Sequence, residues 1–158
     1  MEYRREWPDV RGIGITGQMH GMLYVDANGC AVSPLTTWED ERGNQPYREG
    51  STYAQELSAR SGYEMATGYG LTTHFYNLQN HLVPEQATSM TTIMDYVAMR
   101  LTGRRYPMTH PTNAASFGLF DIRSGSFDKA ACRKAGIDPA ILPEVVQGES
   151  VIGRTADG

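Results

Sequence analysis

The order of its elements predicts an α/β or α+β fold for this chain, with strands first and helices after them. The first forty residues are rich in strand patterns, whereas helix caps and helical periodicity follow from Gly50 onward. A length of 158 residues is enough for one domain with a buried core. No internal repeat interrupts this order.

A strand, a turn and a returning strand are expected near the start. Residues 11–18 read RGIGITGQ and place Ile13 and Ile15 on one face of a strand. Residues 21–25, GMLYV, are followed by DANG, a sequence typical of turns that close hairpins. A second strand then returns through residues 31–38. We therefore expect a hairpin within a small mixed sheet.

Two helices are predicted in the middle of the chain. Thr52, with Gln55 three residues later, forms a capping box, and Gly62 supplies a stop. The second helix is expected over residues 74–85, HFYNLQNHLVPE, ending near Pro84. Its apolar face consists of three residues at 3,4 spacing: Phe75, Leu78 and Leu82.

The clearest helix pattern is TTIMDYVAMRLTG. Thr92 and Asp95 form a capping box, and Gly103 supplies the left-handed end. A further helix is predicted over residues 128–136, capped by its first residue, and Pro139 opens a single turn after it. The apolar stripe of the TTIMDYVAMRLTG helix is expected to comprise Ile93, Val97 and Leu101.

Composition argues against several classes of protein. The chain carries 14 Lys and Arg against 18 Asp and Glu, a net charge of −4, and no basic block that could follow nucleic acid phosphates. No segment approaches the roughly 20 apolar residues of a membrane-spanning helix, and no signal peptide is recognisable, so we expect a cytoplasmic protein. Cys30 and Cys132 lack the spacing of a disulfide framework or a zinc site.

The predicted elements are too few for a complete domain. Several helices have only two or three strands to cover, which leaves strand edges and apolar helix faces unpaired. We therefore expect the chain to be a piece of a larger protein. Exposed strand edges also predict that it can form a homo-oligomer.

Three segments carry side chains suited to ligand binding. Gln18, Met19 and His20 lie between two glycines after the first strand, where a loop can approach a ligand closely. Histidine can hydrogen-bond a hydroxyl through either ring nitrogen. The alternative is that His20 only caps the turn.

The other two segments are TTWEDERGNQ, residues 36–45, and the stretch 109–121. An aromatic ring, carboxylates and a guanidinium are groups with which proteins hold sugars, although a solvated loop has the same composition. Asn113 is expected to open a short helical turn in the third segment, where it could be only a cap. No segment identifies a function by itself.

Other candidate motifs are weaker. Residues 68–70, GYG, lack the spacing of a glycine loop that binds nucleotide phosphates. His74 and His81 are seven residues apart and can share a helix face. Two histidines without a third ligand favour a structural role over a metal site.

Taken in order, the segments resemble the FGGY family of carbohydrate kinases. IGITGQMHGMLYVDANGCAVSPLTTWEDERGNQ resembles the family's sugar-contacting region, and TTIMDYVAMRLTG, TNAASFGLFDIRSGSFD and AGIDPAILPEVVQGESVIGRT resemble the blocks that follow. The resemblance runs from about Arg11 to Thr155. QMHG is similar to ketose kinases such as xylulokinase and sedoheptulokinase, and residues 66–81 and 113–120 look most like sedoheptulokinase.

The resemblance implies a ribonuclease H-like, actin-like ATPase fold, with residues 1–158 as a central fragment of the N-terminal domain. It implies no catalytic residue and no metal ligand within the chain. At His110 several relatives have an aspartate, so this contact differs here. The side chains that the resemblance places around a sugar cleft are Gln18, Met19, His20, Trp38, Asp40, Arg42 and Asn113.

The implied reaction transfers a phosphoryl group from ATP, with Mg²⁺, to a primary hydroxyl of a ketose such as sedoheptulose. The family's phosphate loop would lie upstream of this chain, and its catalytic aspartate and ATP-binding domain downstream, so we expect no turnover by these residues alone. The expected partner is a small-molecule sugar, not nucleic acid or membrane. Two alternatives stay open: a xylulokinase or other polyol kinase of the family, and a non-catalytic sugar-binding or assembly module.

Overall fold

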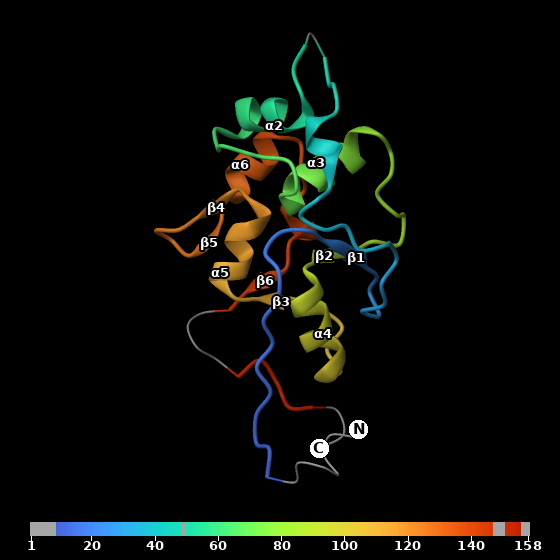
Figure 1. Ribbon diagram of the computed structural model, residues 1–158, viewed down its shortest axis with the longest axis vertical. Helices are drawn as coiled ribbons and strands as arrows, with labels where there is room; N and C mark the ends of the chain where they lie inside the picture. The colour runs from blue at the N-terminus through green and yellow to red at the C-terminus, as the bar shows by residue number, and fades with distance from the viewer. Residues whose placement is uncertain (1–8, 49, 147–150, 156–158) are drawn as a thin grey trace.

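The computed structural model describes residues 9–48, 50–146 and 151–155 (Figure 1). The helices are α2 (Tyr53–Ser61), α3 (Gly70–Gln79), α4 (Ile93–Leu101), α5 (Pro111–Ala114) and α6 (Lys129–Lys134), with 3₁₀ turns at η1 (Glu41–Asn44), η2 (Ala115–Phe117) and η3 (Pro139–Ile141). The strands are β1 (Leu23–Val25), β2 (Ser89–Thr91), β3 (Met108–Thr109), β4 (Phe120–Asp121), β5 (Ser126–Phe127) and β6 (Glu144–Val145). β1 and β2 pair antiparallel, as do β4 and β5, whereas β3 and β6 pair in parallel.

The predicted N-caps of α2, α4 and α6 are confirmed, but only one of the two predicted capping boxes is complete. Thr52 and Gln55 form both hydrogen bonds of a capping box at the start of α2, which ends at Gly62 with a left-handed φ of 79°. The Thr92 side chain accepts from the backbone N–H of Asp95 at the start of α4, but Asp95 Oδ2 accepts from the Thr92 hydroxyl rather than from the Thr92 backbone N–H, so this capping box is only half formed. Asp128 caps α6 in the same way, and Pro139 opens η3. Local hydrogen bonds therefore fix where these helices begin.

β1 is buried on both faces. Tyr24 belongs to the main core cluster with Leu57 of α2 and Phe75 of α3, and Val25 belongs to a second cluster with Met99 of α4. Figure 1 shows α3 and α4 on opposite sides of the β1 and β2 pair. Because successive side chains of a strand point to opposite faces, burial on both faces explains why GMLYV has no polar alternation.

The chain returns beside β1 as the predicted hairpin requires, but the strand expected over residues 31–38 is reduced to isolated bridges, and the strand expected over residues 11–18 does not form. Bridges from Met22 to Thr36 and from Val25 to Ala31 pair the GMLYV segment with the returning chain. The strand expected over residues 11–18 is wrong: no residue of this stretch is in a strand, and its side chains are exposed. No strand within the described residues pairs with this segment, and an extended backbone needs a partner to form a ladder.

Two helix predictions need correction. α3 begins at Gly70 rather than at 74 and ends at Gln79, so Leu82 lies beyond it and is 55% exposed. In α4 the buried residues are Ala98 and Met99, whereas Val97 of the predicted stripe is exposed. The strand pair beneath α4 is short and covers only part of its apolar surface.

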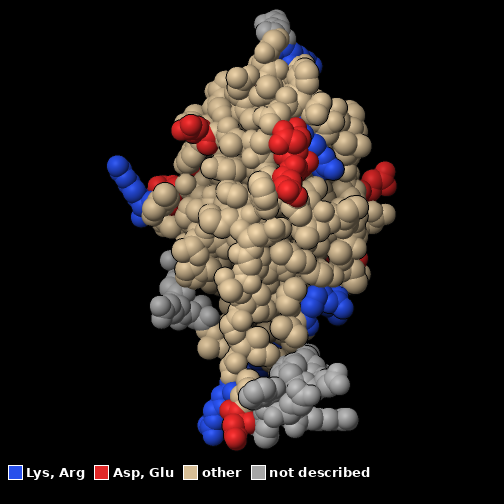
Figure 2. Space-filling model, in the orientation of Figure 1, with Lys and Arg blue, Asp and Glu red and all other residues tan. Residues whose placement is uncertain are grey.

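Charge does not mark a binding surface on the face shown in Figure 2. Acidic and basic side chains are scattered there, and the basic ones form no continuous stripe. None of the described helices is both long and apolar enough to cross a membrane. A candidate site must therefore be located from side-chain contacts.

The core contains a polar pair that stays uncharged. The Tyr24 hydroxyl lies 2.8 Å from His74 Nδ1, and the two residues are 1% and 4% exposed. Burial lowers the pKa of His74 from 6.5 to about 4 and raises the pKa of Tyr24 to about 12. Near neutral pH both side chains are therefore neutral.

The free energy of unfolding should fall as pH is lowered from 6.5 to 4. The unfolded chain takes up a proton on His74 near pH 6.5, whereas the folded chain does so only near pH 4, so acid favours unfolding. The loss attributable to His74 is up to about 3 kcal/mol, complete below pH 4 and absent above pH 6.5. Urea unfolding at several pH values measures it.

His74→Gln should flatten this part of the pH dependence. Thr72→Val also changes a buried polar side chain of α3 but removes no titratable group, so it should keep the unsubstituted protein's slope. Equal slopes for His74→Gln and the unsubstituted protein would contradict the assignment.

Candidate functional site

The loop that leads into α3 and includes its first residue, residues 66–70, joins two of the predicted ligand-binding segments. The Gly21 N–H donates to the Gly68 carbonyl (3.2 Å), and the Thr67 hydroxyl donates to the Asp40 carbonyl (2.7 Å). Gly68 also lies against Trp38, because a Cβ at Gly68 would lie 2.4 Å from the Trp38 carbonyl oxygen. The 66–70 loop therefore holds the QMHG segment and the TTWEDERGNQ segment side by side.

His20 forms long-range contacts rather than a turn cap. Its Nδ1 lies 2.9 Å from the carbonyl oxygen of Ser116, and its ring stacks on Tyr69 with centroids 4.6 Å apart. A carbonyl only accepts, so Nδ1 carries the proton, and Nε2 is left for another partner. His20 has a left-handed φ of 65°, which is uncommon outside glycine and recurs at functional sites.

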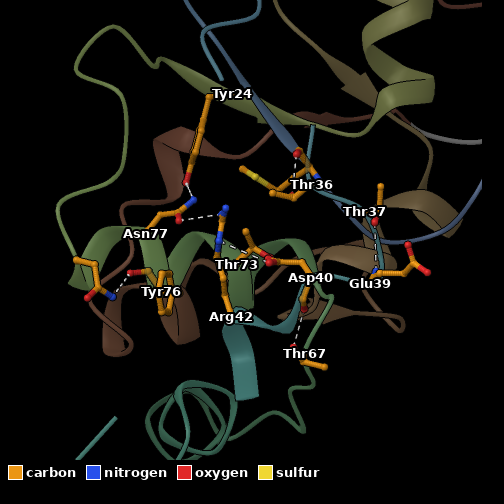
Figure 3. Close-up of polar contacts among 12 residues, drawn as sticks. Tyr24, Thr36, Thr37, Glu39, Asp40, Arg42, Thr67, Thr73, Tyr76 and Asn77 are labelled. Atoms are coloured by element: carbon orange, nitrogen blue, oxygen red, sulfur yellow. Dashed lines mark hydrogen bonds and ion pairs between the residues drawn. The ribbon is translucent and has the colours of Figure 1, made fainter. Parts of the chain in front are cut away.

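Asp40 and Arg42 form an ion pair that rests on α3 (Figure 3). Arg42 Nε lies 3.5 Å from Asp40 Oδ1, and Asp40 Oδ2 accepts from the Thr73 hydroxyl at 2.5 Å. Arg42 Nη1 donates to the Asn77 side-chain oxygen at 3.1 Å. Trp38 next to this pair is 57% exposed, which leaves indole surface available to a ligand.

Asn113 lines a cleft of about 410 Å³, and Met19 lines the same cleft. The Asn113 side-chain amide donates to Asp95 Oδ2 (2.6 Å) and to the Thr92 hydroxyl (2.8 Å). Burial raises the pKa of the Asp95 carboxyl above its usual range. With its NH₂ group used in this way, Asn113 can offer a ligand only its carbonyl oxygen.

The predicted role of Asn113 as the opening residue of a helical turn is wrong. The turn is α5, and its N-cap is His110, whose Nδ1 accepts from the Thr112 N–H. Proline at the first helical position favours a start at Pro111, two residues before Asn113.

The structure thus brings the seven predicted residues together only in part. His20, Trp38, Asp40 and Arg42 lie in segments that contact one another, directly or through the 66–70 loop and α3. Gln18 is exposed and has no side-chain hydrogen bond to any described residue. The other two predicted residues, Met19 and Asn113, line the cleft of about 410 Å³.

Sequence reasoning missed several residues that support the site. Thr73 and Asn77 are four residues apart on α3 and are buried. Polar residues four apart on a helix share a face, which is a signal that could have found them. The other missed residues, which have no comparable signal, are Tyr69, Asp95 and Ser116.

Metal ligands are not evident in this part of the molecule. Among the residues that the structure describes, no three His, Cys, Asp or Glu side chains are grouped so as to hold a metal ion.

Comparison with known proteins assigns the family. The model of the N-terminal domain of the FGGY family of carbohydrate kinases matches residues 6–158. The chain belongs to this family. It is 36% identical to the sedoheptulokinase of Mus musculus and 33% identical to that of Homo sapiens, each over 97% of this chain and 34% of the relative. The chain thus spans about a third of the length of these relatives.

Solved structures show the same fold. A xylulose kinase from Brucella ovis superposes with a TM-score of 0.78 at 22% identity, over 99% of this chain and 33% of that one. Glycerol kinase from Plasmodium falciparum superposes with a TM-score of 0.75 at 21% identity, over 98% and 33%. The predicted ribonuclease H-like, actin-like ATPase fold is therefore confirmed for this FGGY chain, as a partial α/β domain with small sheets.

Gly68→Ala should destabilise this FGGY chain more than Gly62→Ala. Both glycines have a left-handed φ, 82° and 79°, so both variants lose about 1–2 kcal/mol. A Cβ at Gly62 meets open space, whereas one at Gly68 meets the Trp38 carbonyl, which adds about 1–3 kcal/mol. Urea unfolding measures the difference, and equal losses would show that the contact with Trp38 is unimportant.

Proposed function

We propose that this chain forms the sugar-binding side of an ATP-dependent ketose kinase whose substrate is sedoheptulose. The observation that carries the proposal is the 66–70 loop, which holds His20 beside Tyr69 and the exposed Trp38 beside Gly68. Two relatives above 30% identity are named sedoheptulokinase, which supports sedoheptulose as the sugar.

The chemistry of these side chains suits a polyhydroxylated ligand. The exposed indole of Trp38 can pack against the C–H groups of a sugar. His20 Nε2 can exchange a hydrogen bond with a hydroxyl, because Nδ1 is already used by Ser116. Arg42, whose side chain is 38% exposed, can donate to a second hydroxyl beside Asp40.

The groups that transfer phosphate are proposed to lie outside this chain. FGGY kinases use ATP and Mg²⁺. The described residues do not fit these groups, since they contain no cluster of metal-binding side chains and the sequence has no glycine-rich phosphate loop. We therefore assign this chain, as the central part of the N-terminal domain, a role in holding the sugar, and expect no turnover by these residues alone.

Xylulose is the second candidate substrate. Relatives named xylulose kinase, from Staphylococcus xylosus and Streptomyces rubiginosus, are 26% and 27% identical over 94% of this chain. The two sugars are separated by titrating the full-length protein with each of them in a calorimeter. Tighter binding of xylulose would favour the second candidate.

His20→Ala should weaken ketose binding by about tenfold, because it removes one hydrogen bond to the sugar. Calorimetric titration of the full-length protein with sedoheptulose measures the dissociation constant. His81→Ala is the matched control, because His81 also has a left-handed φ, of 57°, and is exposed. Tyr69 marks the candidate site, and α3 separates His81 from Tyr69 by about 15 Å of helix. His81→Ala should therefore leave the affinity for the ketose unchanged.

Two results would argue against this proposal. Equal affinities for His20→Ala and the unsubstituted protein would remove His20 from the sugar site. Ketose binding without ATP-dependent phosphorylation by the full-length protein would instead indicate a non-catalytic sugar-binding module.

A further inference from the structure

A buried chain of hydrogen bonds connects the core to Arg42 (Figure 3). It runs from Arg42 Nη1 to the Asn77 side chain (3.1 Å), from Asn77 to the Tyr24 hydroxyl (3.2 Å), and from Tyr24 to His74 Nδ1 (2.8 Å). Tyr24, His74 and Asn77 are at most 4% exposed, whereas the Arg42 side chain is 38% exposed. The chain therefore begins in the core and ends at the candidate sugar site.

Donor chemistry fixes the direction of every bond. A guanidinium only donates, so the Asn77 oxygen must face Arg42 and its NH₂ must face Tyr24. The Tyr24 oxygen accepts from Asn77, and its own proton has no other acceptor among the described residues, so it is donated to His74 Nδ1. His74 is then the neutral tautomer with the proton on Nε2, in agreement with its burial. Only one arrangement satisfies all four groups.

A second set of contacts holds the same guanidinium from the side. Thr73, Tyr76 and Asn77 share one face of α3, because they lie three and four residues apart. Thr73 holds Asp40, Asp40 pairs with Arg42 Nε, and the Tyr76 ring centroid lies 5.9 Å from the guanidinium carbon. Arg42 Nη2 has no hydrogen-bond partner within the described part of the chain and can donate to a ligand.

We propose that Asn77, held by Tyr24 and His74, is a positioning residue that fixes Arg42 for ketose binding. This inference rests on the proposed sugar site. A long, rotamer-rich side chain that is already held in place loses less entropy when a ligand binds it. Without the Asn77 acceptor, Arg42 must be ordered by the sugar itself, which weakens binding by about 3- to 10-fold.

A double-mutant cycle on the full-length protein tests the proposal, with sedoheptulose and xylulose as calorimetric probes. Asn77→Leu should raise the dissociation constant by about 3- to 10-fold. Arg42→Ala should raise it by about tenfold or more. In the Arg42→Ala background, Asn77→Leu should have no further effect on affinity, although it still lowers the unfolding midpoint.

Two further variants separate positioning from general destabilisation. Thr72→Val removes a buried hydroxyl of α3 that has no hydrogen-bond partner among the described residues, so affinity should not change in either background. Tyr24→Phe keeps the ring but removes the hydroxyl that holds the Asn77 amide. It should weaken ketose binding by about 2- to 3-fold, and this loss should also disappear in the Arg42→Ala background. Tyr24→Phe serves as the test if Asn77→Leu does not fold.

The outcomes distinguish this inference from the proposed function. If Asn77→Leu and Tyr24→Phe each changed the dissociation constant as much in the Arg42→Ala background as in the unsubstituted protein, the positioning role would be overturned. The sugar site itself would still stand. An Arg42→Ala variant that binds ketose as well as the unsubstituted protein would overturn it too. Failure of the unsubstituted protein to bind either ketose would overturn the proposed function, and this inference with it.

Discussion

The approach of three backbone segments at Gly68 is the constraint on which the candidate site depends. The Gly68 carbonyl accepts from Gly21, and its Cα lies so close to the Trp38 carbonyl that no side chain fits between them. The next residue, Tyr69, stacks on His20 and is also the N-cap position of α3. One left-handed glycine therefore sets how two loops are placed relative to the helix behind them.

α3 serves the core and the site at once, which explains its unusual number of buried polar residues. Phe75 packs in the main core cluster, while Thr73 and Asn77 contact the Asp40 and Arg42 pair. Burying polar groups costs free energy unless each finds a partner. The Asn77 and His74 side chains find theirs in the Tyr24 hydroxyl, so the helix can hold a charged residue at the surface without burying a charge.

The sequence predicts an element well when the interaction that forms it joins residues close together in the chain, and poorly when it joins distant ones. The capped helices α2, α4 and α6 were predictable because each cap is formed by residues three apart. β2 was not, because Ser89–Thr91 has no apolar pattern and is a strand only through its pairing with β1. The loops of the site were found by their chemistry, whereas Asn77 acquires its role only when Arg42 folds onto it.

Two of the failed apolar predictions, the strand over residues 11–18 and the stripe of α4, have a common location. The segment predicted as a strand and the last residue of the α4 stripe border one cleft of about 560 Å³, lined by Ile13, Ile15 and Leu101 among others. Periodicity identifies side chains whose burial would be favourable, but burial also requires a partner surface. Among the described residues that partner surface is lacking on this side, so the apolar pattern there is present without a packed interior. On the other side of β1, where α2 and α3 supply the partner, the same kind of pattern gives the buried core that holds Tyr24 in place.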